Sequence, residues 1–511
     1  MIAKINSMSL CGIQGQTITV EADVSDGLPG FVMSGYLASE VREAQDRVRT
    51  AIRNLNLNLY PKKITINLSP ADIRKEGTGF DVAIAIAVLM AHGMLPAGKT
   101  ERTVFVGELG LDGSIKGIPG ILVLTAWAKE CGFQKMVLPE SNLREASFIQ
   151  GIDLIGVKSL DQLVRLLRNG EPVKEHISCK GTEVKREYNQ YSVDFSEVNG
   201  QAVLRRAAEV AASGGHNLMM IGPAGSGKTM VAKRIATILP PMTMMDCIEV
   251  SKVYSVNHML SDDSPLITVR PFRAPHHTVT DKALIGGGSR PRPGEISLAN
   301  GGILFLDELP EMSRTALEAL RQPLEEKQVT ISRLHGNITY PAKFQLVAAL
   351  NPCLCGHYPD LSKCTCTASQ IRRYLSRVSR PLLDRIDICV ETMPMSFEEV
   401  AGMSSNEDSA TIRERVICAR NIQNKRYQGT GIQCNSEMSG AMVREFCAIN
   451  LQENRFLESV FGEMKFSARM YDKILKVART IADMADHKNI EHADLCEAIS
   501  YVRVRERYWR S

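Results

Sequence analysis

The sequence predicts a multidomain α/β protein with three parts: an α+β domain, a parallel α/β core and a helical C-terminal domain. Strand-like and helix-like stretches alternate over the first 170 residues. A second alternation begins near Tyr191 around a glycine-rich loop, and the chain beyond residue 395 shows only helical periodicity. The length of 511 residues, with 44% hydrophobic and 23% charged content, suits a globular protein of two to four domains.

The first part is expected to span residues 1–170. "TITVEADV" and "KKITINLS" alternate as half-buried strands do, and "SEVREAQDRVRTAIRNL" has the spacing of an amphipathic helix. The apolar run Val82–Ala91 is too short to cross a bilayer, so we expect a buried helix there. The polar, irregular stretch 171–190 predicts a linker.

The second part is expected to span residues 191–395, and its strongest motif is "GPAGSGKT", which lies between the strand-like "NLMMI" and the helix-like "MVAKRIATIL". The motif fits G-x-x-x-x-G-K-[ST] in the strand–loop–helix context that this pattern requires. Lys228 would reach the β- and γ-phosphates, and the Thr229 hydroxyl would bind Mg²⁺. We therefore predict ATP and Mg²⁺ as cofactors, with these candidate nucleotide ligands: Gly222, Pro223, Ala224, Gly225, Ser226, Gly227, Lys228 and Thr229.

Two more apolar strands of this core end in polar residues. "ILFL" runs into Asp307, which would hold Mg²⁺, and Glu308, which would polarise the attacking water. "FQLVAAL" runs into Asn351, which would position that water; an ordinary Asn-Pro turn is the alternative.

The third part is expected to span residues 396–511. "SARMYDKILKVARTIADMA" has apolar residues at helical spacing and Ser467 as the expected N-cap. The terminal "YVRVRERYWR" interleaves arginines with aromatic residues. We interpret it as an amphipathic helix, with stacking on nucleic-acid bases as the alternative.

These motifs, together with "RPLLDRIDI", resemble the AAA+ ATPases of the magnesium-chelatase group and, within it, the bacterial YifB/ComM family. The resemblance spans nearly the whole chain and implies an αβα AAA+ core with a helical lid, the nucleotide lying between them. It implies catalytic roles for Glu308, for Asn351 as sensor 1, for Arg469 as the lid's sensor 2, and for Arg385 as an arginine finger.

An arginine finger acts on the neighbouring subunit's nucleotide, so the resemblance also implies a homo-oligomer, a hexameric ring. Two alternatives remain at this point. Arg380 is a rival for the finger, and an ion pair of Arg385 with Asp384 or Asp387 would make Arg385 structural.

In the first part, "LSPADIRKEGTGFDVAIAIAVL" and "VFVGELGLDGSIKGIPGIL" resemble the proteolytic domain of Lon, which uses a Ser–Lys dyad. In this alignment Gly79 replaces the serine and Leu122 replaces the lysine. A site that lacks its nucleophile and its base cannot perform covalent catalysis. We therefore expect a structural or docking module, able to bind a protein partner, and no active protease.

The resemblance places in residues 270–302 an insert that projects toward the ring pore, and the expected hairpin 325–344 is another candidate pore element. Basic loops in a ring pore suit the backbone of single-stranded or branched DNA; solvated loop residues are the alternative. The ComM resemblance implies an ATP-driven DNA motor that migrates branched DNA, while a chelatase-type or a protein-remodelling ATPase are the other hypotheses. The basic residues concerned are Arg270, Arg273, His276, His277, Lys282, Arg290, Arg292, Lys327, Arg333 and Lys343.

Four of the 13 cysteines cluster as two C-x-C pairs: Cys353, Cys355, Cys364 and Cys366. They could bind one structural Zn²⁺ with His357 as a reserve ligand; free or redox-active thiols are the alternative. We expect the cluster to project from the core and to clamp the loop between Asn351 and Arg385. The scattered remaining cysteines and the absence of a signal-like N-terminus suit a cytoplasmic protein without membrane contact.

Overall fold

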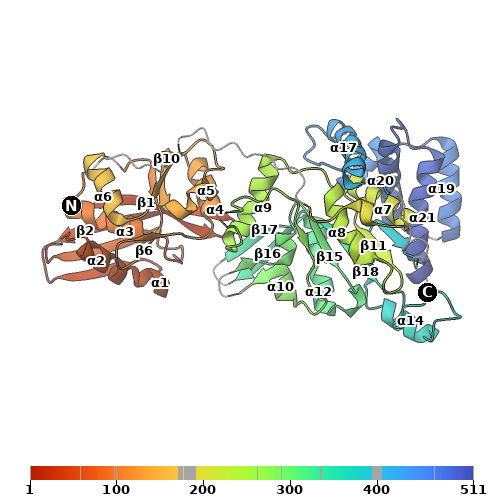
Figure 1. Ribbon diagram of the computed structural model, residues 1–511, viewed down its shortest axis with the longest axis horizontal. Coiled ribbons are helices and arrows are strands. Elements are labelled where there is room, and N and C mark those ends of the chain that lie inside the picture. Colours follow the sequence, from red (N-terminus) through yellow and green to blue (C-terminus); the bar gives the residue numbers. More distant parts are fainter. Residues whose placement is uncertain are drawn as a thin grey trace.

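The computed structural model is elongated, with an α/β domain at one end, a second α/β unit in the middle and a group of helices at the other end (Figure 1). It describes residues 2–170, 176–177, 191–393 and 406–509, except for residues 58, 97, 99, 262, 289–290, 334–335 and 465. Most of the expected linker 171–190 therefore lies outside the described residues. His176–Ile177 within it form strand β10, which pairs with the edge of the N-terminal sheet.

The N-terminal domain is built on a mixed eight-stranded sheet with the order β10-β9-β8-β5-β1-β2-β4-β3. Strand β2 pairs antiparallel with both β1 and β4, whereas β8 pairs in parallel with both β5 and β9. The strands are β1 (Ala3–Cys11), β2 (Gln14–Ser25), β3 (Gly30–Ser34), β4 (Lys63–Ser69), β5 (Thr103–Phe105), β8 (Lys135–Pro139), β9 (Asp153–Val157) and, as a separate hairpin, β6 (Glu108–Leu109) with β7 (Ile115–Lys116). The helices are α1 (Ser39–Arg42), α2 (Ala44–Asn54), α3 (Asp81–Ala91), α4 (Ile121–Glu130), α5 (Leu143–Ala146) and α6 (Leu160–Asn169), with a 3-10 turn at Glu140–Asn142.

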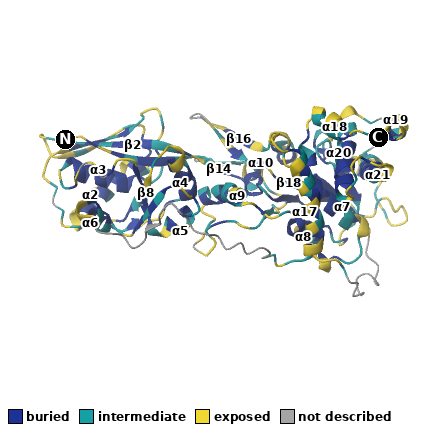
Figure 2. Cartoon of the chain, turned by 90° about the horizontal axis from the view of Figure 1, so that it is seen from above, coloured by how far each residue is buried: buried dark blue, intermediate teal, exposed yellow. Residues whose placement is uncertain are grey.

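Helix α3 forms the centre of this domain. Every residue of α3 is buried, which confirms the buried helix predicted from the uniformly apolar run (Figure 2). The amphipathic helix predicted from Ser39 onward is interrupted at Glu43, which separates α1 from α2. The buried face of α2 carries Val48 and Ile52, so the predicted spacing correctly marks its core side.

The middle unit is a five-stranded parallel sheet with the order β12-β15-β18-β11-β19, which confirms the predicted αβα core. Its strands are β11 (Leu218–Ile221), β12 (Phe272–Arg273), β15 (Ile303–Leu306), β18 (Gln345–Leu350) and β19 (Ile388–Glu391). Its helices are α7 (Ala202–Gly214), α8 (Lys228–Ile238), α9 (Met244–Val256), α10 (Asp281–Ile285), α11 (Glu295–Leu298), α12 (Arg314–Ala319), α13 (Arg321–Glu326), α14 (Ala368–Leu375) and α15 (Arg380–Leu383), with 3-10 turns at Phe195–Glu197 and Leu309–Glu311. Two hairpins leave the sheet: β13 (Gly286–Gly287) with β14 (Arg292–Pro293), and β16 (Gln328–Arg333) with β17 (Gly336–Pro341).

The direction of these strands sets the location of the candidate site. Because all five strands are parallel, their carboxyl ends lie along one edge of the sheet, where ligands of open α/β sheets bind. The glycine-rich loop follows β11, Asp307 follows β15 and Asn351 follows β18. Three segments that are far apart in sequence therefore meet at this edge.

The C-terminal part is helical, as predicted. It comprises α17 (Ser409–Arg426), α18 (Gly440–Phe446), α19 (Leu451–Met464), α20 (Ala468–Met484) and α21 (His492–Trp509), with a 3-10 turn at Asn435–Glu437. Ser467 occupies the N-cap position of α20, but its side chain makes no capping hydrogen bond.

The last helix packs on the core. The Tyr508 hydroxyl donates to Glu391 Oε1 at 2.7 Å, and Trp509 Nε1 donates to the Leu375 carbonyl at 3.1 Å. Arg507 forms an ion pair with Glu391. The aromatic residues of the terminal motif are therefore used in packing, which supports the amphipathic-helix interpretation over base stacking.

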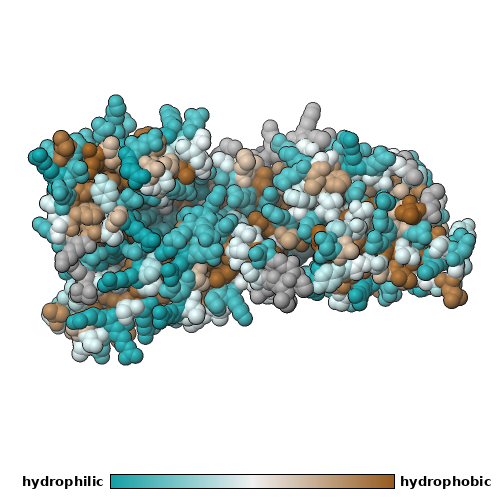
Figure 3. Space-filling model, turned by 180° about the vertical axis from the view of Figure 1, so that it is seen from behind, coloured by the Kyte–Doolittle hydropathy of each residue, from teal (hydrophilic) through white to brown (hydrophobic). Residues whose placement is uncertain are grey.

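Within the described residues, no helix is both long enough and apolar enough to span a membrane. The face in Figure 3 is covered mainly by hydrophilic side chains, with hydrophobic ones scattered among them.

Candidate nucleotide site

The glycine-rich loop has the backbone geometry of a phosphate cradle. Gly225 and Gly227 have φ values of +78° and +82°, in the left-handed region that glycine adopts without strain. Gly222 is required for a different reason, because a Cβ atom there would lie 2.0 Å from Thr392 Oγ1. The loop leads directly into α8, whose first backbone N–H groups have no partner within the helix. This arrangement suits a polyphosphate.

Lys228 lies at the centre of the site. Its ammonium donates to the carbonyls of Gly222 (2.7 Å) and Pro223 (2.8 Å), and Nζ lies 3.3 Å from Asn351 Oδ1. Burial lowers the pKa of Lys228, while the carboxylates of Asp307 and Glu308 oppose that shift. The predicted lysine at the start of α8 and the predicted sensor asparagine just after β18 are thus brought together.

A second contact joins Thr229, at the start of α8, to Asp307, just after β15. Thr229 Oγ1 donates to Asp307 Oδ2 at 2.7 Å, and the Glu308 N–H donates to Asp307 Oδ1 at 2.9 Å. A hydroxyl and a carboxylate are the oxygen ligands that Mg²⁺ accepts alongside substrate phosphates. Of the residues present, Thr229 and Asp307 are therefore the pair that fits Mg²⁺.

Glu308 has a partner that the sequence did not indicate. His277 Nδ1 lies 3.0 Å from Glu308 Oε2, and Glu308 itself adopts a left-handed backbone conformation with φ +49°. The sequence indicates His277 only as one of the basic residues of the first candidate pore segment. The neighbouring strands explain the contact, because β12 pairs with β15 and the chain leaving β12 therefore passes the residues that follow β15.

Arg385 lies at the opposite edge of the sheet. Asn217, just before β11, donates through Nδ2 to the Arg385 carbonyl at 2.7 Å, whereas the phosphate-binding loop follows the other end of β11. Four strand residues span about 13 Å. The guanidinium forms an ion pair with Glu325 and donates to the carbonyls of Arg321 and Pro381. Its ionic partner is thus Glu325, and not Asp384 or Asp387 as the structural alternative supposed.

The other two arginines are exposed. Arg469 lies in the first turn of α20, and Arg380 is the first residue of α15. In the part of the chain that the structure describes, no hydrogen bond or ion pair joins Arg469 to the phosphate-binding loop. The expected position of the nucleotide between the core and the lid therefore stays a prediction.

The whole chain has close relatives among known proteins. Sequence profiles for magnesium chelatase, subunit ChlI, match residues 20–142, 194–400 and, for the C-terminal region, 406–502. Competence protein ComM of Haemophilus influenzae is 39% identical over 508 residues, which is 98% of this chain and 97% of that protein. The uncharacterized protein YifB of Escherichia coli is 40% identical over 97% of this chain and 96% of its own length. This chain belongs to the YifB/ComM family of magnesium-chelatase-like AAA+ proteins.

The N-terminal domain of this YifB/ComM member is also similar to Lon proteases. An archaeal Lon protease of Methanocaldococcus jannaschii is 29% identical over 112 residues, 22% of this chain. Gly79 lies beside Ile118, since a Cβ on Gly79 would be 3.4 Å from the Ile118 Cδ1 atom. Leu122, in the lysine position, is buried in the first turn of α4. Lys75, the nearest lysine in sequence to Gly79, is fully buried and donates to the carbonyls of Pro70 and Ile73.

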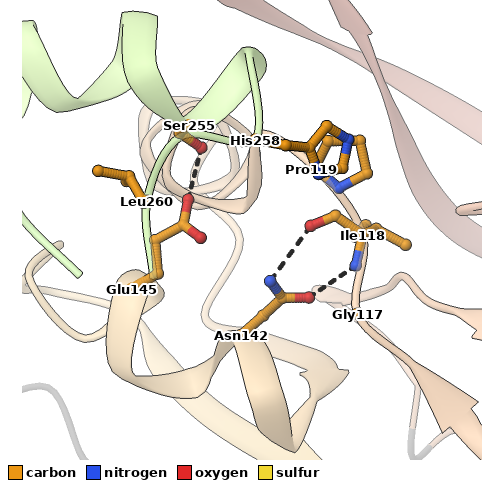
Figure 4. A pocket seen from close by; sticks show the side chains of 8 residues that line it. All are labelled: Gly117, Ile118, Pro119, Asn142, Glu145, Ser255, His258 and Leu260. Atoms are coloured by element: carbon orange, nitrogen blue, oxygen red, sulfur yellow. Dashed lines mark hydrogen bonds between the residues drawn. The ribbon is translucent and has the colours of Figure 1, made fainter. Parts of the chain in front are cut away.

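The same region of the Lon-like domain contacts the AAA+ core (Figure 4). The Gly120 N–H donates to the Ser255 carbonyl at 3.2 Å, and the Ser255 hydroxyl donates to Glu145 Oε1. The same Glu145 oxygen accepts the Leu122 N–H at 3.2 Å, and burial raises the pKa of this carboxyl. A cavity of about 250 Å³ lies beside these groups. The Glu145 carboxylate thus accepts hydrogen bonds both from Leu122, which occupies the lysine position of Lon, and from Ser255 on helix α9 of the core.

The four clustered cysteines converge on one point. Their ligand atoms all lie within 4.8 Å of one another, and the distances from Cys353 to Cys355 and Cys364 are 3.3 and 3.7 Å. Sulfur atoms around a tetrahedral Zn²⁺ are about 3.8 Å apart, given a Zn–S distance of about 2.3 Å. The donor set therefore fits Zn²⁺. His357 is exposed and is not among the converging side chains.

The expectation that this cluster projects from the core is wrong. Cys353 is buried in the hydrophobic core of the AAA+ unit. A Cβ on Gly356 would lie 4.0 Å from the backbone nitrogen of Ala224 in the phosphate-binding loop. The cysteine loop therefore packs beside the glycine-rich loop of the candidate nucleotide site.

Two of the basic residues assigned to the first pore segment serve the fold. Arg270 is half-buried and donates to the carbonyls of Pro240 and Gly301, and Arg273 pairs with Glu295 at 2.7 Å. Lys282, Arg292 and Lys343 are exposed, and Lys327 is half-buried. Arg290 and the side chain of Arg333 lie outside the described residues. The second predicted segment does form a hairpin, β16–β17, and its Ile338 lies against Gly12 of the N-terminal domain.

Proposed function

We propose that this protein is an ATP-hydrolysing ring motor that acts on single-stranded or branched DNA. The observation that carries the ATPase part is the convergence of Lys228, Thr229, Asp307, Glu308 and Asn351 at the carboxyl edge of the parallel sheet. This is the set that phosphoryl transfer needs: a lysine for the phosphates, a hydroxyl and a carboxylate for Mg²⁺, and a carboxylate for water.

Each side chain then has a distinct role. Lys228, already 3.3 Å from Asn351, contacts the β- and γ-phosphates, and Thr229 with Asp307 holds Mg²⁺. Bound Mg²⁺ would neutralise charge that develops on the phosphate oxygens. Glu308 orients and polarises the attacking water, while Asn351 places that water in line with the γ-phosphate.

The proposal includes a homo-oligomeric ring, for which we expect six subunits. Arg385 is at the far edge of the sheet from its own phosphate-binding loop, so the nucleotide it serves belongs to a neighbouring subunit. Arg469 completes the site as the lid arginine. A guanidinium is suited to meet charge developing on the γ-phosphate, since it stays protonated and offers several fixed donors.

DNA is the favoured substrate for two reasons. The ComM relative, which aligns over nearly its full length, is named a competence protein, and Lys282, Arg292 and Lys343 are exposed on the candidate pore segments. Exposed lysines and arginines bind a phosphate backbone without reading its sequence. The alternative is a chelatase-type or protein-remodelling ATPase, for which the Lon-like domain, lacking the Ser–Lys dyad, would bind the protein partner.

Single-stranded DNA and four-way junctions are expected to raise the ATPase rate of the full chain several-fold at low salt. The stimulation should weaken as salt rises from about 50 to 200 mM, because counterion release drives phosphate binding. A Lys282→Ala, Arg292→Ala double variant should keep the DNA-independent rate and lose most of the stimulation. No stimulation by DNA, together with no shift of a labelled four-way junction, would favour the protein-remodelling alternative.

The Lon-like domain is expected to have no protease activity. Cleavage of casein by the purified protein would refute that expectation.

We also propose that Cys353, Cys355, Cys364 and Cys366 bind a structural Zn²⁺. Metal analysis of the purified chain should find about one zinc per chain. A Cys364→Ser, Cys366→Ser variant should fall below about half a zinc and unfold at a lower temperature, because bound metal contributes folding free energy. Cys418→Ser, a change at an exposed single cysteine, is the matched control and should keep the metal. A parent protein without zinc would favour the free-thiol alternative.

A further inference from the structure

A largely buried polar network joins three elements below the candidate nucleotide site, and the side chains of its charged members Lys473 and Asp387 are 13% and 15% exposed. It comprises His216 and Asn217 before β11, Asp387 before β19, and Lys473 with Thr480 on α20. Lys473 Nζ lies 3.3 Å from Asp387 Oδ1, and His216 Nδ1 lies 3.5 Å from Asp387 Oδ2. All of these side chains lie away from the phosphate-binding loop, so the roles assigned above do not use them.

Several further hydrogen bonds hold the network together. Asn217 donates its backbone N–H to Asp387 Oδ2 at 3.2 Å and its amide to the Arg385 carbonyl at 2.7 Å. Lys473 also donates to the Ile386 carbonyl at 2.8 Å, and His216 Nε2 lies 2.8 Å from Thr480 Oγ1. Asp387 thus contacts the lid helix on one oxygen and the start of the phosphate-loop strand on the other.

The charges of Asp387 and Lys473 stabilise each other against the effect of burial. Burial lowers the pKa of Lys473, and the Asp387 carboxylate opposes that shift. Burial alone raises the pKa of Asp387, but the Lys473 ammonium and the His216 ring lower it below its ordinary value overall. Burial lowers the pKa of His216, which keeps that ring neutral at pH 7. The pair that remains is the Asp387 carboxylate with the Lys473 ammonium. A buried pair adds little to stability compared with apolar packing, so its value lies in fixing a geometry.

The geometry that it fixes involves both candidate catalytic arginines. Arg385 lies two residues before Asp387, and Arg469 lies one helical turn before Lys473 on α20. We propose that Asp387 is a positioning residue that joins the arginine-finger segment to the lid helix and thereby holds Arg385 in position toward the neighbouring subunit's nucleotide. This inference rests on the proposed ATPase function and adds a residue that does not touch the nucleotide.

An Asp387→Asn variant is expected to lower kcat for ATP by about tenfold to 100-fold, since small misplacements of catalytic groups cost that much. The KM for ATP should change little, because Lys228 and Thr229 are untouched. Asp384→Asn, in the same segment but paired only at 3.7 Å with Arg505, is the matched control and should stay near the parent rate. A Lys473→Met, Asp387→Asn double variant removes both buried charges together and tests the same loss if the single variant folds poorly.

Rings that contain both Glu308→Gln and Asp387→Asn subunits can distinguish a misplaced Arg385 from a damaged nucleotide site. Glu308→Gln subunits keep an intact finger, so adding them to Asp387→Asn subunits should raise the rate per Asp387→Asn subunit. A defect in that subunit's own site would not be rescued. A folded Asp387→Asn protein with parent kcat, or a mixture without rescue despite assembly, would overturn the proposal.

Hydrogen exchange tests the linkage without any hydrolysis. In the full chain, Asp387→Asn should speed amide exchange in residues 380–387 and in the first turns of α20 by about tenfold, and leave α2 of the N-terminal domain unchanged. Unchanged exchange at both places would refute the linkage even if the chain proved not to be an ATPase. Altered exchange in a chain without ATPase activity would instead refute the proposed function and keep the linkage.

Discussion

Replacing Glu308 with glutamine is expected to lower the ATP hydrolysis rate by about 100-fold or more. Glutamine keeps the size of the side chain but removes the carboxylate that polarises water, and such general-base contributions are about 10²- to 10⁴-fold. ATP binding should persist, because Lys228 and Thr229 make their contacts without Glu308. Steady-state hydrolysis together with binding of a fluorescent ATP analogue would measure both effects.

The matched control for this change is Glu311→Gln. Glu311 lies three residues further along and pairs with Arg377 on the surface at 2.8 Å. It should behave like the parent, since exposed pairs contribute little. Equal loss in both variants would mean that the acids after β15 support the fold and that Glu308 has no special role. His277, which contacts Glu308, is kept unchanged in both variants.

The elements and the geometry of the candidate nucleotide site are largely predictable from the sequence because their signals are local. The strand "ILFL" is β15 residue for residue, and the phosphate-binding loop lies between β11 and α8 as the motif requires. The meeting of Lys228, Asp307 and Asn351 also followed, since parallel strands bring their carboxyl ends to one edge. The apolar runs and the parallel direction of the strands are therefore enough to predict most of the candidate site.

The contacts that prediction missed are those between residues far apart in sequence. Nothing near Arg385 indicates that Glu325, 60 residues earlier, is its ionic partner. The packing of Gly356 against Ala224 depends on how the cysteine loop folds back over β18, which no local pattern states. Likewise, the contact of Glu145 with Ser255 depends on how two domains dock, and both residues look like ordinary surface positions in the sequence.

Arg385→Ala is expected to lower kcat by about 10³-fold in the assembled protein, the lower end of what an arginine finger contributes. Binding of ATP to each subunit should be retained, because Arg385 is at the far edge of the sheet from its own Lys228. Hydrolysis at saturating ATP, with assembly checked by light scattering, measures this. Arg380→Ala, a change at an exposed arginine five residues earlier, should stay near the parent rate; the reverse pattern would make Arg380 the finger.

The partner of Arg385 distinguishes a finger from a structural ion pair. If Arg385 serves only to pair with Glu325, then Glu325→Gln should lower kcat as much as Arg385→Ala, because either change breaks the same contact. If Arg385 acts on the neighbouring nucleotide, Glu325→Gln should leave kcat near the parent value or raise it, since the guanidinium is then freer to leave its own subunit. The two explanations thus predict opposite results for one conservative substitution at a residue that the nucleotide never contacts.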